Sequence, residues 1–173
     1  WTDLDSWHWN NLILPPGVRT APFEFSAKMS KPVAAWATFG PSGIEGRVSA
    51  GSFAEFEDAI ISTPNRESVA VRVTSAGTFA AGSGNVLAPR QFIADALLSD
   101  EQRRRQDVYR KMIPGTRNTV YPDRPTLFVW AKPVANGFEF PEQTRQLGSA
   151  LVAIPLVIEQ TPPHTQVTIP SPF

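Results

Sequence analysis

The stretches Thr126–Val134, TLFVWAKPV, and Ser149–Gln160, SALVAIPLVIEQ, decide the predicted fold. In the first, Leu127 begins one series of alternate residues and Phe128 begins the other, and both series are largely apolar. The second stretch alternates in the same way and is again apolar on both sides. A strand with two apolar faces is typical of one that is covered on both sides. We therefore predict that these two strands form the middle of a β core.

Further strands are predicted earlier in the chain. Residues 33–39, VAAWATF, and residues 44–50 are separated by Gly40–Gly43, whose sequence GPSG is typical of a turn, so they read as a hairpin. Residues 68–74, SVAVRVT, alternate between valine on one side and Ala, Arg and Thr on the other. This period of two predicts a strand with its valines directed inward.

A short helix is predicted over residues 52–62. Ser52 and Glu55 have the spacing of a capping box, in which each side chain accepts a hydrogen bond from the backbone N–H of the other residue. Thr63–Pro64 would end the helix, because a proline disfavours helical backbone in the residue before it. The apolar residues expected to face the core recur with helical spacing, and they are Phe53, Phe56 and Ile60.

A helical insertion is predicted over residues 89–113. Pro89 suits a first helical position. Ser99 and Gln102 form a second capping box, so we expect a break or a new helix start near Ser99. Pro114–Gly115 would end the insertion.

This order of elements predicts an α+β, mainly β domain with an antiparallel β-sandwich-like core. The 173 residues fit a single domain, and 17 prolines favour short strands joined by stiff turns. Within the domain 1–173 we distinguish a Trp/Pro-rich N-terminal segment (1–22), a helical insertion with its connectors (76–125), and the core strands with a Pro-rich tail (126–173).

Composition argues against several classes of partner. The net charge is zero and the pI is about 7.0, so the basic footprint of a nucleic-acid-binding protein is missing. The chain has no cysteine, which removes disulfide and thiol chemistry. Its longest apolar run, Ala150–Ile158, is well short of the roughly 20 residues of a membrane-spanning helix. Proximity to a membrane remains open, because Trp-rich segments favour membrane–water interfaces.

No catalytic, cofactor-binding or metal-binding residues are predicted. The two histidines, His8 and His164, are not accompanied by a Gly-x-Ser-x-Gly nucleophile motif, and no Cys/His pair has zinc spacing. Glu55, Glu57 and Asp58 cluster in sequence, but acidic residues are favoured near a helix start, which explains them without catalysis.

Partner contacts are predicted for the two ends of the chain and for the one basic cluster. The tryptophans near the N-terminus are candidates because aromatic side chains favour interfaces. The proline-rich C-terminus is a candidate because free chain ends are usually disordered unless a contact holds them in place. Trp36 and Trp130 are instead expected within the core, because they lie inside predicted strands. The predicted partner-binding residues are Trp1, Trp7, Trp9, Arg103, Arg104, Pro170 and Phe173.

The sequence thus predicts a non-enzymatic accessory or structural subunit that makes protein–protein contacts in a larger assembly. We expect this assembly to be extracytoplasmic, in the periplasm or at the cell surface, and associated with a membrane. The alternative is a carbohydrate-binding module that stacks sugars on exposed tryptophans such as Trp7 and Trp9. A third hypothesis is an enzyme with a site at His8 or His164 beside a carboxylate.

Overall fold

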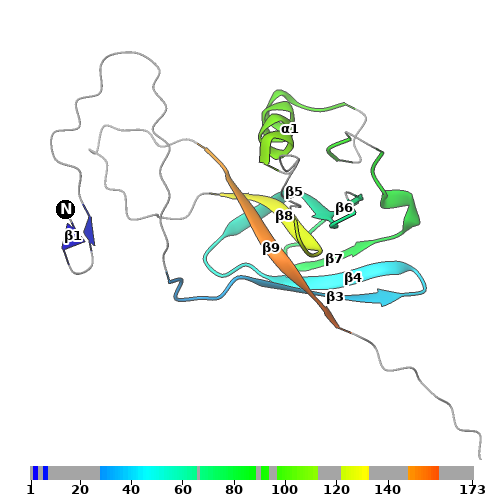
Figure 1. Ribbon diagram of the computed structural model, residues 1–173, viewed down its shortest axis with the longest axis horizontal. Helices are drawn as coiled ribbons and strands as arrows, with labels where there is room; N and C mark the ends of the chain where they lie inside the picture. The colour runs from blue at the N-terminus through cyan, green and yellow to red at the C-terminus, as the bar shows by residue number, and fades with distance from the viewer. Residues whose placement is uncertain are drawn as a thin grey trace, which may run out of the picture.

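The computed structural model describes residues 28–65, 67–88, 91–93, 97–112, 122–132 and 148–159, and the backbone of residues 2–3 and 6–7 (Figure 1). The strands are β1 Thr2–Asp3, β2 Ser6–Trp7, β3 Ala34–Gly40, β4 Gly43–Ser49, β5 Ala54–Ser62, β6 Ser68–Val71, β7 Thr78–Ala81, β8 Thr126–Lys132 and β9 Ala150–Glu159. The helices are the 3-10 turn η1, Ser83–Asn85, and α1, Asp100–Met112. β1 and β2 form an antiparallel pair of their own.

The other seven described strands form one sheet in the order β6-β5-β8-β9-β3-β4-β7. Neighbours are antiparallel except for β3 and β9, which run parallel. The two outer strands of this order come close together, because Val86, directly after the η1 turn that follows β7, bridges Val69 of β6. Next to it the Leu87 N–H donates to the Ser68 carbonyl at 2.8 Å. The sheet therefore curls until it is nearly a barrel.

One apolar core lies inside this curl and receives side chains from all seven strands. We call the side of the sheet that faces this core the inner face, and the opposite side the outer face. The buried inner residues are Ala35, Ala37, Ile44, Val48, Ala59, Ile61, Val71, Phe79, Ala81, Leu127, Val129, Ile154 and Leu156. The predicted α+β, mainly β class is confirmed. The predicted sandwich is not shown, because these strands form a single curled sheet.

The two strands predicted at the centre do lie there, next to each other in the order. In β8, Thr126 to Ala131 are all buried, so the prediction of a strand covered on both faces is confirmed. In β9 the prediction is wrong for part of the outer face: Leu151 is half-buried, whereas Pro155 and Val157 are exposed, and on the inner face Ile154 and Leu156 are buried. The predicted hairpin is confirmed as β3 and β4, and the predicted strand 68–74 as the shorter β6.

A second apolar layer covers the outer face of β5, β6 and β8, on the side where Figure 1 shows α1. Tyr109 of α1 lies between two other rings, with centroid distances of 5.6 Å to Phe92 and 5.8 Å to Phe128. The buried members of this layer are Ile60, Ala70, Leu87, Phe92, Ile93, Tyr109, Phe128 and Trp130. Trp130 is therefore in the core as predicted.

The predicted helix 52–62 is wrong, because these residues form β5. Between Ala54 and Ile60 the strand advances six residues while its partner β8 advances four, so it contains two bulges. Glu55 and Asp58 carry positive φ angles of 54° and 45° at these bulges. Each bulge adds one residue between successive inward side chains, so Phe56 and Ala59 point inward three residues apart. Phe56 and Ala59 thus have a helix-like spacing, whereas Ile60, which was predicted on the same face as Phe56, lies on the outer face.

The predicted helical insertion 89–113 is also corrected, because α1 begins at Asp100. The capping box at its start is confirmed: the Ser99 N–H donates to Gln102 Oε1 at 3.0 Å, and the Gln102 N–H donates to Ser99 Oγ at 3.1 Å. Before it, Phe92 and Ile93 are described but not helical. Both are buried, because this segment packs across the outer face of the sheet.

Gly46 in β4 makes room for the largest ring of the inner core. Phe79 lies directly opposite it on β7 and is buried. A Cβ at position 46 would lie 2.3 Å from Phe79 Cζ and 2.4 Å from the Trp36 carbonyl oxygen. Glycine weakens a strand, but here a neighbouring aromatic ring covers the gap.

Replacing Gly46 by Ala is therefore expected to lower the free energy of unfolding by about 1–3 kcal/mol, the usual cost of overpacking. Urea denaturation would measure the loss. Gly40→Ala is the matched control, because nothing lies within 4 Å of a Cβ there. Equal stability of the two variants would contradict this role of Gly46.

Candidate functional site

The bulges of β5 place two consecutive carboxylates, Glu57 and Asp58, on the outer face. In a regular strand, two consecutive side chains would point to opposite faces. Both accept hydrogen bonds from Arg105 Nη1 of α1, at 2.7 Å to Glu57 Oε2 and 2.6 Å to Asp58 Oδ2. Gln102 Nε2 donates to the other Asp58 oxygen at 3.0 Å. The Arg105 guanidinium also lies 5.5 Å from the centroid of the Trp130 ring, within cation–π range.

The Arg105–Asp58 pair is largely shielded from water, with exposed fractions of 12% for the Arg105 side chain and 11% for Asp58, whereas Glu57 is exposed. Burial alone would lower the pKa of Arg105. The hydrogen bonds to Asp58 and Glu57 and the attraction of their charges outweigh it and raise that pKa above its ordinary value. Arg105 therefore stays charged. The hydrogen bonds from Arg105 and Gln102 to Glu57 and Asp58 attach α1 to the bulged strand β5.

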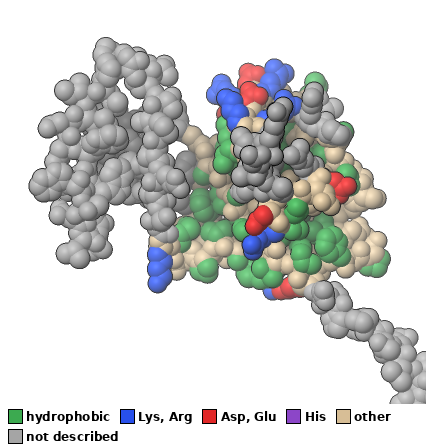
Figure 2. All heavy atoms as spheres, viewed as in Figure 1, with side chains coloured by type: hydrophobic (Ala, Val, Ile, Leu, Met, Phe, Trp, Pro, Cys, Tyr) green, Lys and Arg blue, Asp and Glu red, His purple; other side chains and the backbone are tan. Residues whose placement is uncertain are grey.

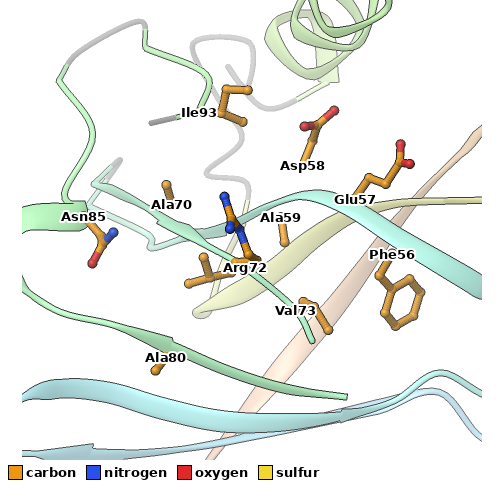
Figure 3. A pocket seen from close by; sticks show the side chains of 11 residues that line it. Phe56, Glu57, Asp58, Ala59, Ala70, Arg72, Val73, Ala80, Asn85 and Ile93 are labelled. Carbon is orange, nitrogen blue, oxygen red and sulfur yellow. The ribbon is translucent and has the colours of Figure 1, made fainter. Parts of the chain in front are cut away.

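A pocket of about 280 Å³ opens beside this cluster (Figure 3). Glu57 and Asp58 lie on one side of it, Asn85 on the opposite side, and the exposed Arg72 between them. Small and apolar side chains complete the lining: Phe56, Ala59, Ala70, Val71, Val73, Ala80 and Ile93. Within the described residues, no group of three or more His, Asp or Glu side chains could hold a metal ion.

A second surface lies on the part of the outer face of β4, β3 and β9 that the apolar layer under α1 does not cover. Trp36 of β3 is half-buried there, with the Arg47 guanidinium 5.1 Å from its ring centroid. Arg47 Nη2 in turn donates to Glu159 Oε1 at 3.4 Å. Together with Thr38 and Glu45 these side chains line a shallow depression. Trp36 was expected in the core, so this is a correction.

Apolar side chains continue this surface along β9. Val157 is 53% exposed, and Ala153 and Pro155 are exposed as well. Figure 2 shows hydrophobic side chains at the surface in the lower part of the view, where Figure 1 places β3 and β4. We call the outer-face set Ala153, Pro155, Val157, Glu159, Trp36, Thr38, Glu45 and Arg47 the uncovered face.

Of the predicted partner-binding residues, the side chains of Arg103 and Arg104 are described, and they lie on α1 and not on the uncovered face. Arg103 and Arg104 are exposed on α1, and their nearest acidic partners are Asp100 at 3.8 Å and Glu101 at 3.9 Å, one helical turn away. The Trp7 backbone belongs to β2, but its side chain lies outside the described part of the chain. Outside it as well lie the remaining predicted contacts, Trp1, Trp9, Pro170 and Phe173, and both histidines, His8 and His164.

Sequence reasoning missed the uncovered face although the alternation that builds it was visible. Simple alternation along residues 33–39 and 150–158 sets Trp36 opposite Ala35 and Ala37, and Pro155 and Val157 opposite Ile154 and Leu156, as the structure has them. Because both faces of these strands carry apolar side chains, the sequence predicts that other parts of the protein cover both faces. Which face of a strand another layer covers depends on where α1 docks, and the alternation carries no information about that.

No family model, no curated protein and no solved structure matches this chain. In the described part of the chain, no helix is long and apolar enough to span a bilayer.

Proposed function

We propose that this chain is a non-enzymatic interaction module that docks a partner protein on the uncovered face. The observation that carries the proposal is the apolar outer side of β9, which has no described layer over it. A sheet face that meets water normally alternates apolar-in and polar-out. Here three successive outward-facing residues of β9, namely Ala153, Pro155 and Val157, are apolar. Burying them against a partner would remove apolar surface from water.

Trp36 and Arg47 support a protein partner. Tryptophan and arginine are enriched among the residues that dominate binding energy in protein interfaces. Arg47 is already held by Glu159 and by the Trp36 ring, so little side-chain freedom would be lost on binding. A sugar stacking on the Arg47 side of Trp36 would have to displace Arg47, which favours the protein partner over the carbohydrate ligand at this place.

The module is proposed to act as an accessory or structural subunit of a larger extracytoplasmic, membrane-associated assembly. Its lack of cysteine suits a compartment in which thiols would otherwise mispair. Its zero net charge suits docking through apolar contact in place of long-range attraction.

A photo-crosslinking amino acid at Val157 is expected to give a covalent adduct with another protein chain in the cells that produce the protein. The same amino acid at Val108, exposed on α1, is the matched control and is expected to give little adduct. Mass spectrometry of the adducts identifies the chain. No adduct at position 157, or equal adducts at both positions, would overturn the proposal.

A further inference from the structure

We propose that the pocket beside the Arg105 cluster (Figure 3) binds a small zwitterion, an α-amino acid with an apolar side chain. The pocket lies at the place where the curled sheet does not close, between β6 and β7, and we call this opening the seam. The seam is separate from the uncovered face, so the proposed function does not depend on this inference. Its support comes from unpaired backbone groups, from opposite charges at the rim and from an apolar lining.

The seam is short and bounded at both ends. The hairpin between β6 and β7 bounds one end, where the Thr74 N–H donates to the Thr78 carbonyl at 2.8 Å. The bridge between Val69 and Val86 bounds the other end. Between these two contacts, no backbone hydrogen bond joins the described residues of the two strands. An opening of this kind suits a small ligand better than an additional strand running along the edge.

Three residues that line the pocket direct unpaired backbone groups into the seam. In antiparallel strands, alternate residues direct their N–H and C=O groups to the same side. The Ser68 carbonyl and the Thr74 N–H both bond across the seam, so Ala70 and Arg72 between them also face it. The same alternation on β7 brings Ala80 to the seam. Among the described residues these N–H and C=O groups have no hydrogen-bond partner, so they are free to bind a ligand that both donates and accepts.

The charges at the pocket favour a ligand that carries both signs. Glu57 and Asp58 both accept hydrogen bonds from Arg105, which stands outside the lining. Arg72 is exposed and has no ion-pair partner among the described residues. Two carboxylates thus face two guanidinium groups, so a ligand without net charge adds no uncompensated charge to the site. Glu57 uses Oε2 for Arg105, which leaves Oε1 to accept from an ammonium group.

Arg72 and Asn85 supply the donors for a carboxylate. Asn85 Oδ1 accepts from the Gly82 N–H at 3.0 Å, so its Nδ2 group remains a donor. A guanidinium group binds a carboxylate through two parallel hydrogen bonds. Figure 3 shows Arg72 between Asn85 and the acidic pair. A carboxylate held by Arg72 and Asn85 therefore leaves the ammonium group of the same ligand on the side of Glu57.

The apolar lining determines the side chain of the ligand. Phe56, Ala59, Val71 and Val73 belong to the inner face, and Ile93 belongs to the layer on the outer face. The pocket volume of about 280 Å³ lies just below the range of about 300–1,000 Å³ that is typical of pockets for drug-sized ligands. We therefore expect a small aliphatic side chain such as that of leucine.

Two-dimensional NMR of the isotope-labelled chain tests the inference with L-leucine as the probe. Titration is expected to shift the amide signals of Ala70, Arg72 and Ala80 and to leave that of Val157, on the uncovered face, unchanged. L-Leucinamide lacks the carboxylate and isocaproate lacks the ammonium group. Each is expected to bind about tenfold more weakly or worse, the scale of a lost hydrogen bond between charged groups. Tighter or equal binding of either analogue would overturn the zwitterion, and the absence of any shift with leucine would overturn the site.

Arg72→Met is expected to weaken leucine binding about tenfold or more, because the carboxylate loses its cation. Arg72 is exposed and methionine keeps its aliphatic stem, so the fold should persist, which unchanged amide signals of β8 would verify. Arg124→Met removes the same charge from an exposed side chain outside the lining and is expected to bind leucine like the parent. Equal affinities for Arg72→Met and Arg124→Met would contradict the inference.

Discussion

Replacing Arg105 by Met is expected to lower the free energy of unfolding by about 3–5 kcal/mol, the cost of leaving a buried charge without its partner. The Arg105 guanidinium contacts Glu57, Asp58 and the Trp130 ring, and it is 12% exposed. Asp58 would lose its ionic partner in a site from which water is largely excluded. Methionine keeps the unbranched aliphatic stem that packs there, so the measured loss reflects the charge. Urea denaturation followed by tryptophan fluorescence measures it.

Two further variants separate the ion pair from general damage. Glu57→Gln is expected to cost at most about 1 kcal/mol, because Glu57 is exposed and Asp58 still neutralises Arg105. Adding Asp58→Asn to Arg105→Met is expected to restore part of the stability, because the unpaired charge is gone. Asn tolerates the positive φ of this position and can still accept from Gln102. Additive losses in the double variant would contradict a direct charge interaction.

The contrast between β8 and β5 shows what the sequence could predict of this fold. β8 has an uninterrupted period of two, so its alternation predicted the strand and both of its apolar faces. β5 hides its period because Glu55 and Asp58 sit in bulges. Neither residue is a glycine, the usual sequence sign of left-handed backbone. Local pattern therefore favoured a helix, and only pairing with β8 stabilises the strand.

The candidate sites were unpredictable for a related reason. The capping box identified where α1 begins, because that signal is local. The salt bridges from Arg105 to Glu57 and Asp58 join residues 48 and 47 positions apart, and no local rule relates them. The position of α1 also decides that the outer face over β8 is covered while Val157 on β9 is exposed. Burial of one face follows from tertiary docking, which alternation does not encode.

Phe128→Ala is expected to destabilise the protein by about 3–5 kcal/mol, the range for removing a buried aromatic side chain. Phe128 is 1% exposed, and its ring meets Tyr109 of α1 edge-on, with an interplanar angle of 86°. The truncation would leave a cavity between sheet and helix, beside the Tyr109 ring that Phe128 contacts. Urea denaturation measures the loss in the same way as for Arg105.

Phe39→Ala is the matched control, because it removes the same atoms from a side chain that is 66% exposed, and it should change stability by no more than about 0.5 kcal/mol. Combining Phe128→Ala with Arg105→Met asks whether α1 docks as one unit. If either substitution already releases α1 from the sheet, the second substitution removes fewer contacts. The double variant should then lose less free energy of unfolding than the sum of the two single losses. Full additivity would mean that Arg105 and Phe128 hold the helix independently. Equal losses for Phe128→Ala and Phe39→Ala would contradict the buried aromatic layer itself.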